Sequence, residues 1–308
     1  MESSVNAVEA NKIVKRFGEQ VAVDGVNFTV TERECYGLLG PNGAGKTTIL
    51  RMIHCFYTLT GGEISVFGLD VKNGWREIKK FIGVVPQENN LDDMLTVFEN
   101  LLVYARYFNI PRKVARERAD ELLAFVQLDG RRNSRIKELS SGMKRRLIIA
   151  RALINSPRII ILDEPTTGLD PQARHLIWQR LRALKRTGVT MVLTTHYMEE
   201  ATQICDRVAV IDRGKILLEG NPLELVKERV GNEVLEVQLG DGDDGNLVSF
   251  LEEERIPFEV AGDKLYLFCD DGKECMETLW NRGYQHLLHR TATLEDLFLR
   301  LTGRGLRE

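Results

Sequence analysis

A glycine-rich segment near the N-terminus limits the possible folds of this 308-residue chain more than any other part of it. Residues 40–47 match the pattern G-x-x-x-x-G-K-[ST]. The apolar run Cys35–Leu39 precedes the segment, and a helical pattern over Thr47–Phe56 follows it. A glycine-rich turn between a buried strand and a helix is typical of an α/β fold with a phosphate-binding loop, or P-loop.

The residue types of this loop suit the binding of phosphate groups. Its glycines allow backbone N–H groups to turn inward, and the N-terminus of the following helix adds the positive end of its dipole. Lys46 can reach the β- and γ-phosphates of a nucleotide, and the Thr47 hydroxyl can ligate Mg²⁺. The flanking strand and helix disfavour an ordinary turn with a chance lysine. The expected phosphate-binding residues are Gly40, Pro41, Asn42, Gly43, Ala44, Gly45, Lys46, Thr47 and Thr48.

A second buried strand ends in two carboxylates. The apolar run Ile159–Leu162 is followed by Asp163 and Glu164. Parallel sheets place their ligands at the carboxyl ends of strands, so Asp163 is expected to be a Mg²⁺ partner. Glu164 is expected to be the general base for an attacking water. An acidic helix cap is the alternative, but the next helix is predicted to begin only at Pro171, with Asp170 as its cap.

Apolar runs that indicate strands alternate with helical patterns through about residue 225. This alternation predicts a mostly parallel sheet covered by helices. Further strands are predicted at Arg158–Leu162, Val189–Thr194 and Arg207–Ile211, and further helices at Ser140–Leu153, Pro171–Arg186 and Tyr197–Cys205. Residues from about 88 to 156 interrupt the alternation with helices predicted at Leu91–Phe108 and Lys113–Leu128. We therefore expect a helical subdomain inserted into the α/β core.

The composition changes after Glu228, which predicts a first domain over residues 1–228 and a second over residues 229–308. An acidic, glycine-rich turn is predicted at residues 240–245. The elements expected around it are strand Glu233–Leu239, helix Leu247–Glu254, strands Pro257–Val260 and Lys264–Phe268, helix Lys273–Arg282 and strand Tyr284–His289. The order βαββαβ predicts a small ferredoxin-like α+β domain.

Composition and charge exclude several other classes of protein. Hydrophobic residues make up 43% of the chain, more than a disordered chain could leave unburied. Lys and Arg number 42 against 45 Asp and Glu, and this net charge of −3 argues against a nucleic-acid binder. No apolar run approaches the roughly 18 residues that span a bilayer, and the N-terminus lacks the features of a signal peptide. Five irregularly spaced cysteines favour a reducing, cytoplasmic compartment.

Several short segments, in this order along the chain, resemble the motifs of ATP-binding cassette (ABC) transporter ATP-binding subunits. Besides the P-loop and the strand-end carboxylates, they include Gln87 (the Q-loop), Leu139–Met143 (the family signature), Thr167–Asp170 (the D-loop) and His196 (the switch histidine). Phe17 matches the aromatic residue that stacks on adenine. The resemblance covers roughly residues 8–225. Taken singly, such residues have ordinary structural explanations, such as a core aromatic or a helix cap.

The resemblance implies a P-loop NTPase core that binds ATP and Mg²⁺ and hydrolyses the nucleotide. It implies that Gln87 contacts Mg²⁺ and the attacking water and that His196 contacts the γ-phosphate. It also implies a head-to-tail dimer with two composite ATP sites, in which one copy's signature and D-loop complete the P-loop site of the other. The residues expected to do so are Ser140, Ser141, Gly142 and Asp170.

The signature departs from the usual family sequence, which is Leu-Ser-Gly-Gly-Gln. Ser141 replaces the first glycine and Met143 replaces the glutamine. Ser141 adds a side chain where the backbone comes close to phosphate, which bears on the rate of hydrolysis. Slow turnover would suit an alternative function, that of an ATP-gated scaffold or regulatory ABC protein. Soluble family members with two cassettes or a long coiled coil are disfavoured, because the chain has one cassette and no sustained heptads.

Other segments resemble one subgroup, the nodulation-factor and daunorubicin-resistance export ATPases. They are Met143–Leu147, Thr166–Arg174, Thr194–Glu200 and Thr293–Gly303. This resemblance implies export of a lipid-linked, drug-like or saccharide cargo by separate multi-span permease subunits, with this chain at the inner face of the cell membrane. The helical subdomain is expected to carry the permease-docking groove, near Glu88–Glu99. A dimer-stabilising or regulatory role is expected for the C-terminal domain.

Overall fold

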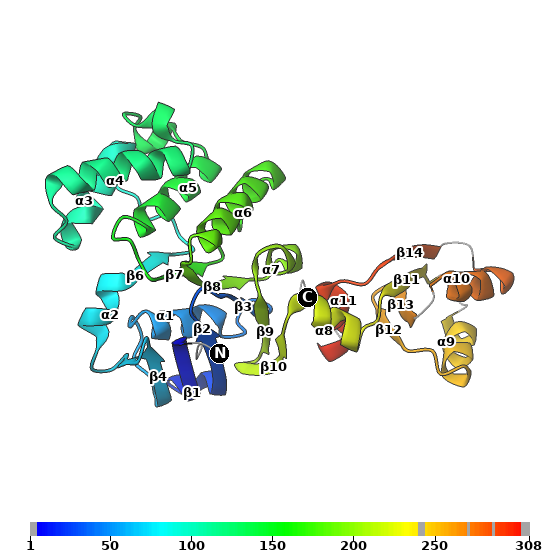
Figure 1. Cartoon of the computed structure of the whole chain (residues 1–308). Coiled ribbons are helices and arrows are strands. Elements are labelled where there is room, and N and C mark those ends of the chain that lie inside the picture. The colour runs from blue at the N-terminus through cyan, green and yellow to red at the C-terminus, as the bar shows by residue number, and fades with distance from the viewer. Residues whose placement is uncertain (1–4, 240–243, 270–271, 285–286, 303–308) are drawn as a thin grey trace. The chain divides into compact units, whose positions relative to one another are not determined.

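The computed structural model of the chain describes residues 5–239, 244–269, 272–284 and 287–302. It divides into two compact units, Met1–Leu218 and Glu219–Glu308 (Figure 1). The sequence predicted the boundary after Glu228 instead. The difference arises because helix α8 (Pro222–Arg229) packs against α11 (Leu294–Thr302), and therefore belongs to the second unit.

The central sheet of the first unit confirms the predicted mostly parallel α/β core. Its strand order is β10 (Lys215–Gly220), β9 (Arg207–Asp212), β3 (Cys35–Leu39), β8 (Thr190–Thr195), β7 (Ile159–Asp163) and β6 (Ile82–Val85). β3 runs parallel to both β8 and β9, and β7 runs parallel to both β6 and β8. β3, β7 and β8 are buried along their whole length, which agrees with the apolar residues that make up most of β3 and β7 and the centre of β8.

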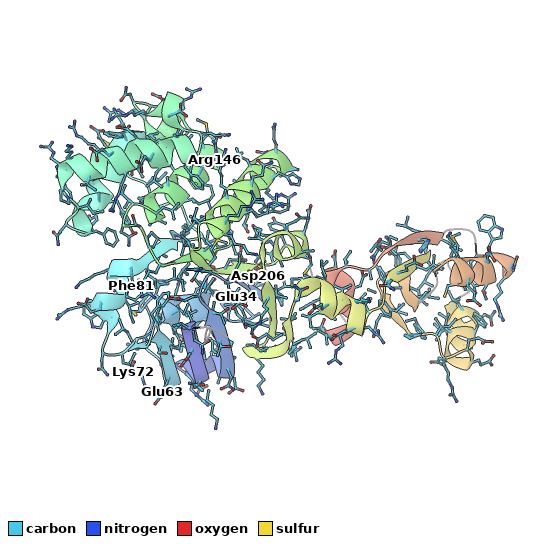
Figure 2. All side chains as sticks on the ribbon, viewed as in Figure 1. Glu34, Glu63, Lys72, Phe81, Arg146 and Asp206 are labelled. Atoms are coloured by element: carbon cyan, nitrogen blue, oxygen red, sulfur yellow. The ribbon has the colours of Figure 1, made fainter. Side chains whose placement is uncertain are left out.

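The start of β3 is held by bonds to the chain beside it. The Cys35 N–H donates to the Asp206 carboxylate at 2.9 Å, and Arg207 pairs with Glu34 at 2.9 Å. Figure 2 shows Glu34 and Asp206 near each other at this end of the sheet. These contacts fix the strand that leads into the P-loop.

A second, antiparallel sheet was not predicted from the sequence. Its strand order is β2 (Gln20–Thr31), β1 (Asn6–Phe17), β4 (Gly61–Val66) and β5 (Leu69–Asp70). Helix α1 (Lys46–Ile53) contributes Ile49, Met52 and other residues to a core shared with both sheets. This arrangement places Phe17, at the end of β1, on the same unit as the P-loop.

The inserted helices form a subdomain with its own core. They are α3 (Val97–Tyr107), α4 (Arg112–Phe125) and α5 (Ser141–Ala152), joined by short 3₁₀ turns at Asp129–Arg131 and Ile136–Glu138. Figure 1 shows the three helices grouped away from β1, β2 and β4. α3 begins later than the predicted Leu91, because Thr96 and Glu99 form a capping box that starts the helix at Val97.

Three more helices complete the first unit. α2 (Trp75–Phe81) precedes β6, and α7 (Met198–Ile204) follows β8. α6 (Pro171–Arg186) has the predicted bounds, and the predicted cap is confirmed because the Asp170 carboxylate accepts the Ala173 N–H at 2.9 Å. In the part of the chain that the structure describes, no helix is long and apolar enough to cross a membrane.

The second unit confirms the predicted ferredoxin-like order. Its elements are β11 (Glu233–Gln238), α9 (Asp244–Glu253), β12 (Phe258–Ala261), β13 (Lys264–Cys269), α10 (Gly272–Asn281) and β14 (Leu287–Thr291). The strand order is β12-β13-β11-β14, with antiparallel neighbours throughout. α9 and α10 share one core with the sheet. Residues 240–243 of the predicted acidic turn, 285–286 of the predicted last strand and Gly303 of the subgroup segment lie outside the described residues.

Candidate nucleotide site

The P-loop joins β3 to α1 through glycines that no other residue could replace without strain. Gly45 precedes α1 in a left-handed conformation, with φ of 105°. A Cβ there would lie 2.4 Å from the Ala22 carbonyl oxygen, and one on Gly40 would lie 2.1 Å from that of Ile211. With glycine as its N-cap, α1 has no side chain to occupy its first N–H groups. They are therefore available to an anion.

Lys46 places a buried ammonium group at the loop. Only 4% of the residue is exposed, and Nζ donates to the carbonyls of Gly40 at 2.7 Å and Pro41 at 2.9 Å. Nζ also lies 3.9 Å from Oε1 of Glu164. Burial lowers the pKa of Lys46, and the charges of Glu164 and Asp163 oppose this shift. The loop thus joins backbone N–H donors and a cation in one concave surface.

The Asp163 carboxylate accepts hydrogen bonds from hydroxyls of helix α1 and of the neighbouring strand β8. The hydroxyls of Thr47 and Thr194 both donate to its Oδ1, at 2.9 Å and 2.6 Å. Thr194 stands directly opposite Asp163 in the pairing of β7 with β8. Carboxylate and hydroxyl oxygens that lie together beside a phosphate-binding loop suit Mg²⁺. This ion prefers oxygen ligands and is usually coordinated by protein and phosphate oxygens together.

The carboxylate of Glu164 contacts several polar side chains of the cleft. Gln87 Nε2 and Thr167 Oγ1 donate to Oε2, at 3.2 Å and 3.0 Å. His196 Nδ1 lies 3.4 Å from Oε1. The contacts with His196, Thr167 and Lys46 hold the pKa of Glu164 below its ordinary value, although burial opposes this. Glu164, 6% exposed, is therefore ionised near neutral pH.

The backbone at Glu164 is strained. Its φ is 45°, in the left-handed region that residues other than glycine rarely adopt. Such a conformation costs roughly 1–3 kcal/mol and persists only where surrounding contacts hold it.

Most of the predicted site residues line one cleft of about 600 Å³. The lining residues are Phe17, Gln20, Ala22, Asn42, Gly43, Ala44, Gly45, Lys46, Thr47, Thr48, Gln87, Glu164, Thr167 and His196. Phe17 is 43% exposed, which is unlike a core phenylalanine. Its ring meets the Tyr57 ring edge-on at 5.2 Å, and Lys15 Nζ lies 5.0 Å from its centroid. These contacts hold the ring in place while its surface stays open.

The signature residues and Asp170 of the D-loop are not brought to that cleft. Ser140, Gly142 and Asp170 instead line a second hollow of about 520 Å³ between α5 and α6. The Ser140 hydroxyl caps α5 by accepting the Met143 N–H at 3.3 Å. Ser141, in the first turn of α5, is exposed. This chain therefore separates the predicted ATP-contacting residues into two groups.

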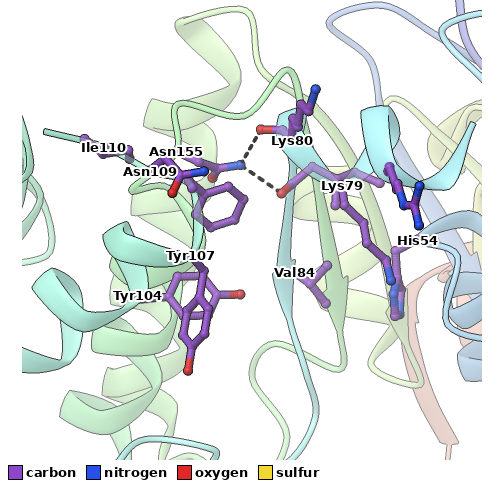
Figure 3. Close-up of a pocket in the computed structure, with 12 residues that line it drawn as sticks. His54, Lys79, Lys80, Val84, Tyr104, Tyr107, Asn109, Ile110 and Asn155 are labelled. Carbon is purple, nitrogen blue, oxygen red and sulfur yellow. Dashed lines mark hydrogen bonds between the residues drawn. The ribbon is translucent and has the colours of Figure 1, made fainter.

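A third hollow, of about 650 Å³, lies between α2 and α3 (Figure 3). α2 supplies Arg76, Lys79 and Lys80, while α3 and its end supply Tyr104, Tyr107 and Phe108. Asn155 stands between the two walls and donates to the carbonyls of Lys80 and Ile82 at 3.0 Å and 3.1 Å. None of the described lining residues is Asp or Glu, and none falls within the expected segment 88–99.

Sequence analysis missed three polar residues around the cleft. Thr194 bonds Asp163, and its place beside the histidine motif on a buried strand was the available signal. Thr167 lies inside the D-loop motif but was not predicted to act in the site, although its hydroxyl donates to Glu164. Arg145 donates to backbone carbonyls around the cleft. Every residue has a backbone carbonyl, so no residue type in the sequence indicates which one accepts such a bond.

The sequence is similar to known proteins over nearly its whole length. A family model described as ABC transporter matches residues 23–167, and one described as Nodulation factor export protein NodI, C-terminal domain, matches residues 250–303. The Nod factor export ATP-binding protein I of Mesorhizobium japonicum is 46% identical over 99% of this chain and 89% of its own. The chain belongs to the ABC transporter family. It is an ATP-binding, ATP-hydrolysing subunit of the NodI type.

Another ABC relative, the Nod factor export ATP-binding protein I of Burkholderia thailandensis, is 45% identical over 99% of this chain and all of its own. Solved ABC cassettes share the fold of the first unit. The dimeric cassette MJ0796 bound to ADP and Pi has a TM-score of 0.64 and 31% identity, covering 70% of this chain and 98% of its own. CbiO1 of Clostridium perfringens, part of the transporter complex cbiONQ, has a TM-score of 0.68 and 27% identity, covering 73% and 92%.

Proposed function

We propose that this chain is the ATPase subunit of a membrane exporter and works as a head-to-tail dimer with two composite ATP sites. The observation that carries the proposal is the convergence of Gln87, Thr167, His196 and Lys46 on the Glu164 carboxylate inside the P-loop cleft. An ionised, oriented carboxylate at that position is what hydrolysis of a terminal phosphate needs.

Each group in the cleft has a separate task in this proposal. Lys46 and the N–H groups of the P-loop hold the β- and γ-phosphates, and Phe17 stacks on the adenine. Glu164 accepts a proton from the attacking water, which Gln87 helps to orient. His196 contacts the γ-phosphate from the other side of the carboxylate.

The cleft also fits a Mg²⁺ ion. Thr47, Asp163 and the amide oxygen of Gln87 would hold it together with the phosphates, since these are the oxygen donors that Mg²⁺ prefers. When bound, the ion would neutralise charge that develops on the phosphate oxygens.

The second copy would supply the groups that this chain keeps away from its own cleft. The capped start of α5 presents backbone N–H groups beside Ser140, Ser141 and Gly142, a surface suited to a γ-phosphate. Asp170 lines the same hollow. The dimeric MJ0796 cassette, which is similar to this chain, supports a pair of cassettes as the working unit.

The basic and aromatic hollow of Figure 3 is our proposed docking groove for the permease. One wall comes from the helical subdomain, as expected, and the other carries Arg76, Lys79 and Lys80. These charges suit an acidic segment of a permease. Docking there would hold the chain at the inner face of the cell membrane. With a net charge of −3, nucleic acid is not among the proposed partners.

The relatives support export as the direction of transport. Proteins named for the export of Nod factor match both units of this chain at 45–46% identity. The cargo class we propose is lipid-linked, drug-like or saccharide.

The test of this proposal is Glu164→Gln. Removal of the base is expected to lower ATP hydrolysis by ~10²–10⁴-fold while ATP still binds, and to trap an ATP-bound dimer. Glu199→Gln, an exposed glutamate on α7, is the matched control and keeps the wild-type rate. Near-normal hydrolysis by Glu164→Gln would remove Glu164 from the mechanism. Slow wild-type turnover without a co-purifying multi-span protein would favour the ATP-gated scaffold.

The groove is tested by charge reversal at Arg76 and Lys79. Basal hydrolysis is expected to stay unchanged, while binding of the co-expressed permease and its effect on the rate are lost. The two reversals are made singly, and Lys72→Glu, which makes the same change of charge outside the groove, is expected to leave permease binding intact. Equal binding by all three variants would place the docking surface elsewhere.

A further inference from the structure

Arg145, on helix α5, bonds the backbone of both loops that carry the hydrolytic side chains. The residue is 7% exposed and is packed inside the first unit. A guanidinium has five N–H groups, and here each meets a carbonyl. Nε donates to Pro165 at 2.7 Å, Nη1 to Pro86 and to Gln87 (3.3 Å), and Nη2 to Asp163 (2.8 Å) and Glu164 (2.9 Å).

The bonded carbonyls belong to the segments whose side chains must meet in the cleft. One segment carries Gln87 and the other carries Glu164, and their side chains are joined by a hydrogen bond of 3.2 Å. The Glu164 backbone is also the strained one, with φ of 45°. A rigid planar group bonded to both segments sets their separation and holds the strained peptide in place.

The charge of Arg145 is retained inside the protein. Burial lowers its pKa to about 10, and the charges of Glu200, Asp163 and Glu164 oppose this, so the group is protonated at neutral pH. Charged donors make shorter and stronger hydrogen bonds than neutral ones. The helix that carries Arg145 begins with the signature residues. In the proposed dimer, the same helix would contact the other copy's nucleotide at its start and this cleft through Arg145.

A second arginine supports the link between α5 and the Q-loop segment. Arg151, also buried, donates to the carbonyl of Asn90 at 2.8 Å and to its side-chain oxygen. α5 therefore holds the stretch from Pro86 to Asn90 at two points.

We propose that Arg145 is a positioning residue for ATP hydrolysis, which sets the relative place of Gln87 and Glu164 from the signature helix. This inference rests on the proposed role of Glu164 as the base. It predicts that loss of Arg145 affects the chemical step and leaves ATP binding by Lys46 and Phe17 nearly unchanged. A purely structural role would lower the amount of folded protein and change binding and turnover alike.

An arginine on the neighbouring helix α4 provides a matched control. Arg118 Nη1 also donates to a backbone carbonyl, that of Ile154 at 3.2 Å. Arg118→Met removes the same charge and the same kind of bond from the helical subdomain, without touching the loops of Gln87 and Glu164.

The experiment measures kcat, the Kd for ATP and thermal unfolding of Arg145→Met, Arg145→Lys and Arg118→Met. Misplacement of a catalytic group by about 1 Å can cost about 100-fold, so Arg145→Met is expected to lower kcat by about that factor with little change in Kd. Arg145→Lys keeps the charge but has three donors on one atom, and its kcat is expected to lie between those of Arg145→Met and wild type. Arg118→Met is expected to keep the wild-type kcat.

The same substitutions are then made in the Glu164→Gln background. If Arg145 acts through Glu164, Arg145→Met lowers the residual rate of that background far less than it lowers the wild-type rate. Equal factors in both backgrounds, or a wild-type kcat in Arg145→Lys and Arg145→Met, would overturn the inference. If Arg145→Met does not fold, the rates of Arg145→Lys in the two backgrounds are compared instead. Normal hydrolysis by Glu164→Gln alone would refute the role of Glu164 as the base, and this result is distinct from a failure of the role of Arg145.

Discussion

The P-loop cleft and the surface at the start of α5 differ in how many partners their polar groups have. In the cleft, the Glu164 carboxylate contacts Gln87, Thr167, His196 and Lys46. At the α5 surface, the Ser140 hydroxyl only caps its own helix. The polar groups of the cleft are thus held in place within one chain, whereas Ser140 and Ser141 at the α5 surface are exposed. In the dimer that we propose, one copy carries half of each reaction site.

The largest loss of activity is expected at Asp163. Asp163→Asn removes the charge that gathers the hydroxyls of Thr47 and Thr194, and should lower hydrolysis by about 10³-fold, the upper range for loss of one electrostatic group. Thr194→Val removes one hydrogen bond to the same oxygen and should cost only about 10–100-fold. Steady-state ATPase assays at saturating Mg²⁺ check both. Equal losses would mean that the carboxylate acts only through its hydrogen bonds.

At the α5 surface, Ser140→Asp and Ser140→Asn separate capping from phosphate contact. Both side chains cap a helix well, so the fold of α5 is expected to survive in each. Only aspartate sets a negative charge against an incoming phosphate, and it should lower the rate about 100-fold, with asparagine much closer to wild type. ATP binding to the isolated chain should be unchanged in both variants. A loss of binding would place Ser140 in the chain's own cleft.

The pH dependence of hydrolysis is expected to follow the ionisation of Glu164 in the cleft. The pKa of Glu164 is lowered in the folded chain, chiefly by His196 and then by Thr167. A depressed carboxyl pKa gives stability that is present above its ordinary value, about 4.3, and lost as the pH falls through the folded value. The acid limb due to Glu164 should therefore lie below about pH 4.3.

Thr167→Val removes one of the bonds that lower this pKa and should move the acid limb to higher pH. The profile of kcat/KM against pH, compared between wild type and this variant, measures the displacement. A limb that does not move would show that Thr167 has no influence on the ionisation of Glu164.

The smallest effect is expected at Ser141. Its φ is negative, as in an ordinary helix, and its side chain is exposed in the first turn of α5. Serine therefore fits there without strain. Ser141→Gly should change the ATPase rate by about twofold or less, and lower stability by about 0.5 kcal/mol or less. ATPase assays and thermal unfolding check these values. A large gain in rate would mean that the serine slows turnover, in favour of the scaffold.

The parts that could be predicted from the sequence are those with local signals. The pattern of residues 40–47 located the P-loop, and Asp170 with Pro171 gave the start of α6. Unbroken apolar runs predicted β3 and β7 because strands buried on both faces need apolar residues throughout.

The parts that were missed depend on distant contacts. Buried and exposed residues do not alternate regularly along β1, because its pairing with β2 shifts register near Lys12, whose φ is 46°. The sequence of this strand therefore shows no clear two-residue hydrophobic period. The apolar spacing from Leu91 suggested a helix, but the Thr96 cap decided where it starts. Arg145 reaches backbone carbonyls far along the chain, and no residue type marks such acceptors.

The most direct test of the central claim is the mass of Glu164→Gln in solution with and without ATP, alone and combined with Ser140→Asp. The account predicts a dimer only with ATP for the single variant, and a monomer that still binds ATP for the double variant. A single variant that binds ATP and stays monomeric would contradict the claim that a second copy completes the site.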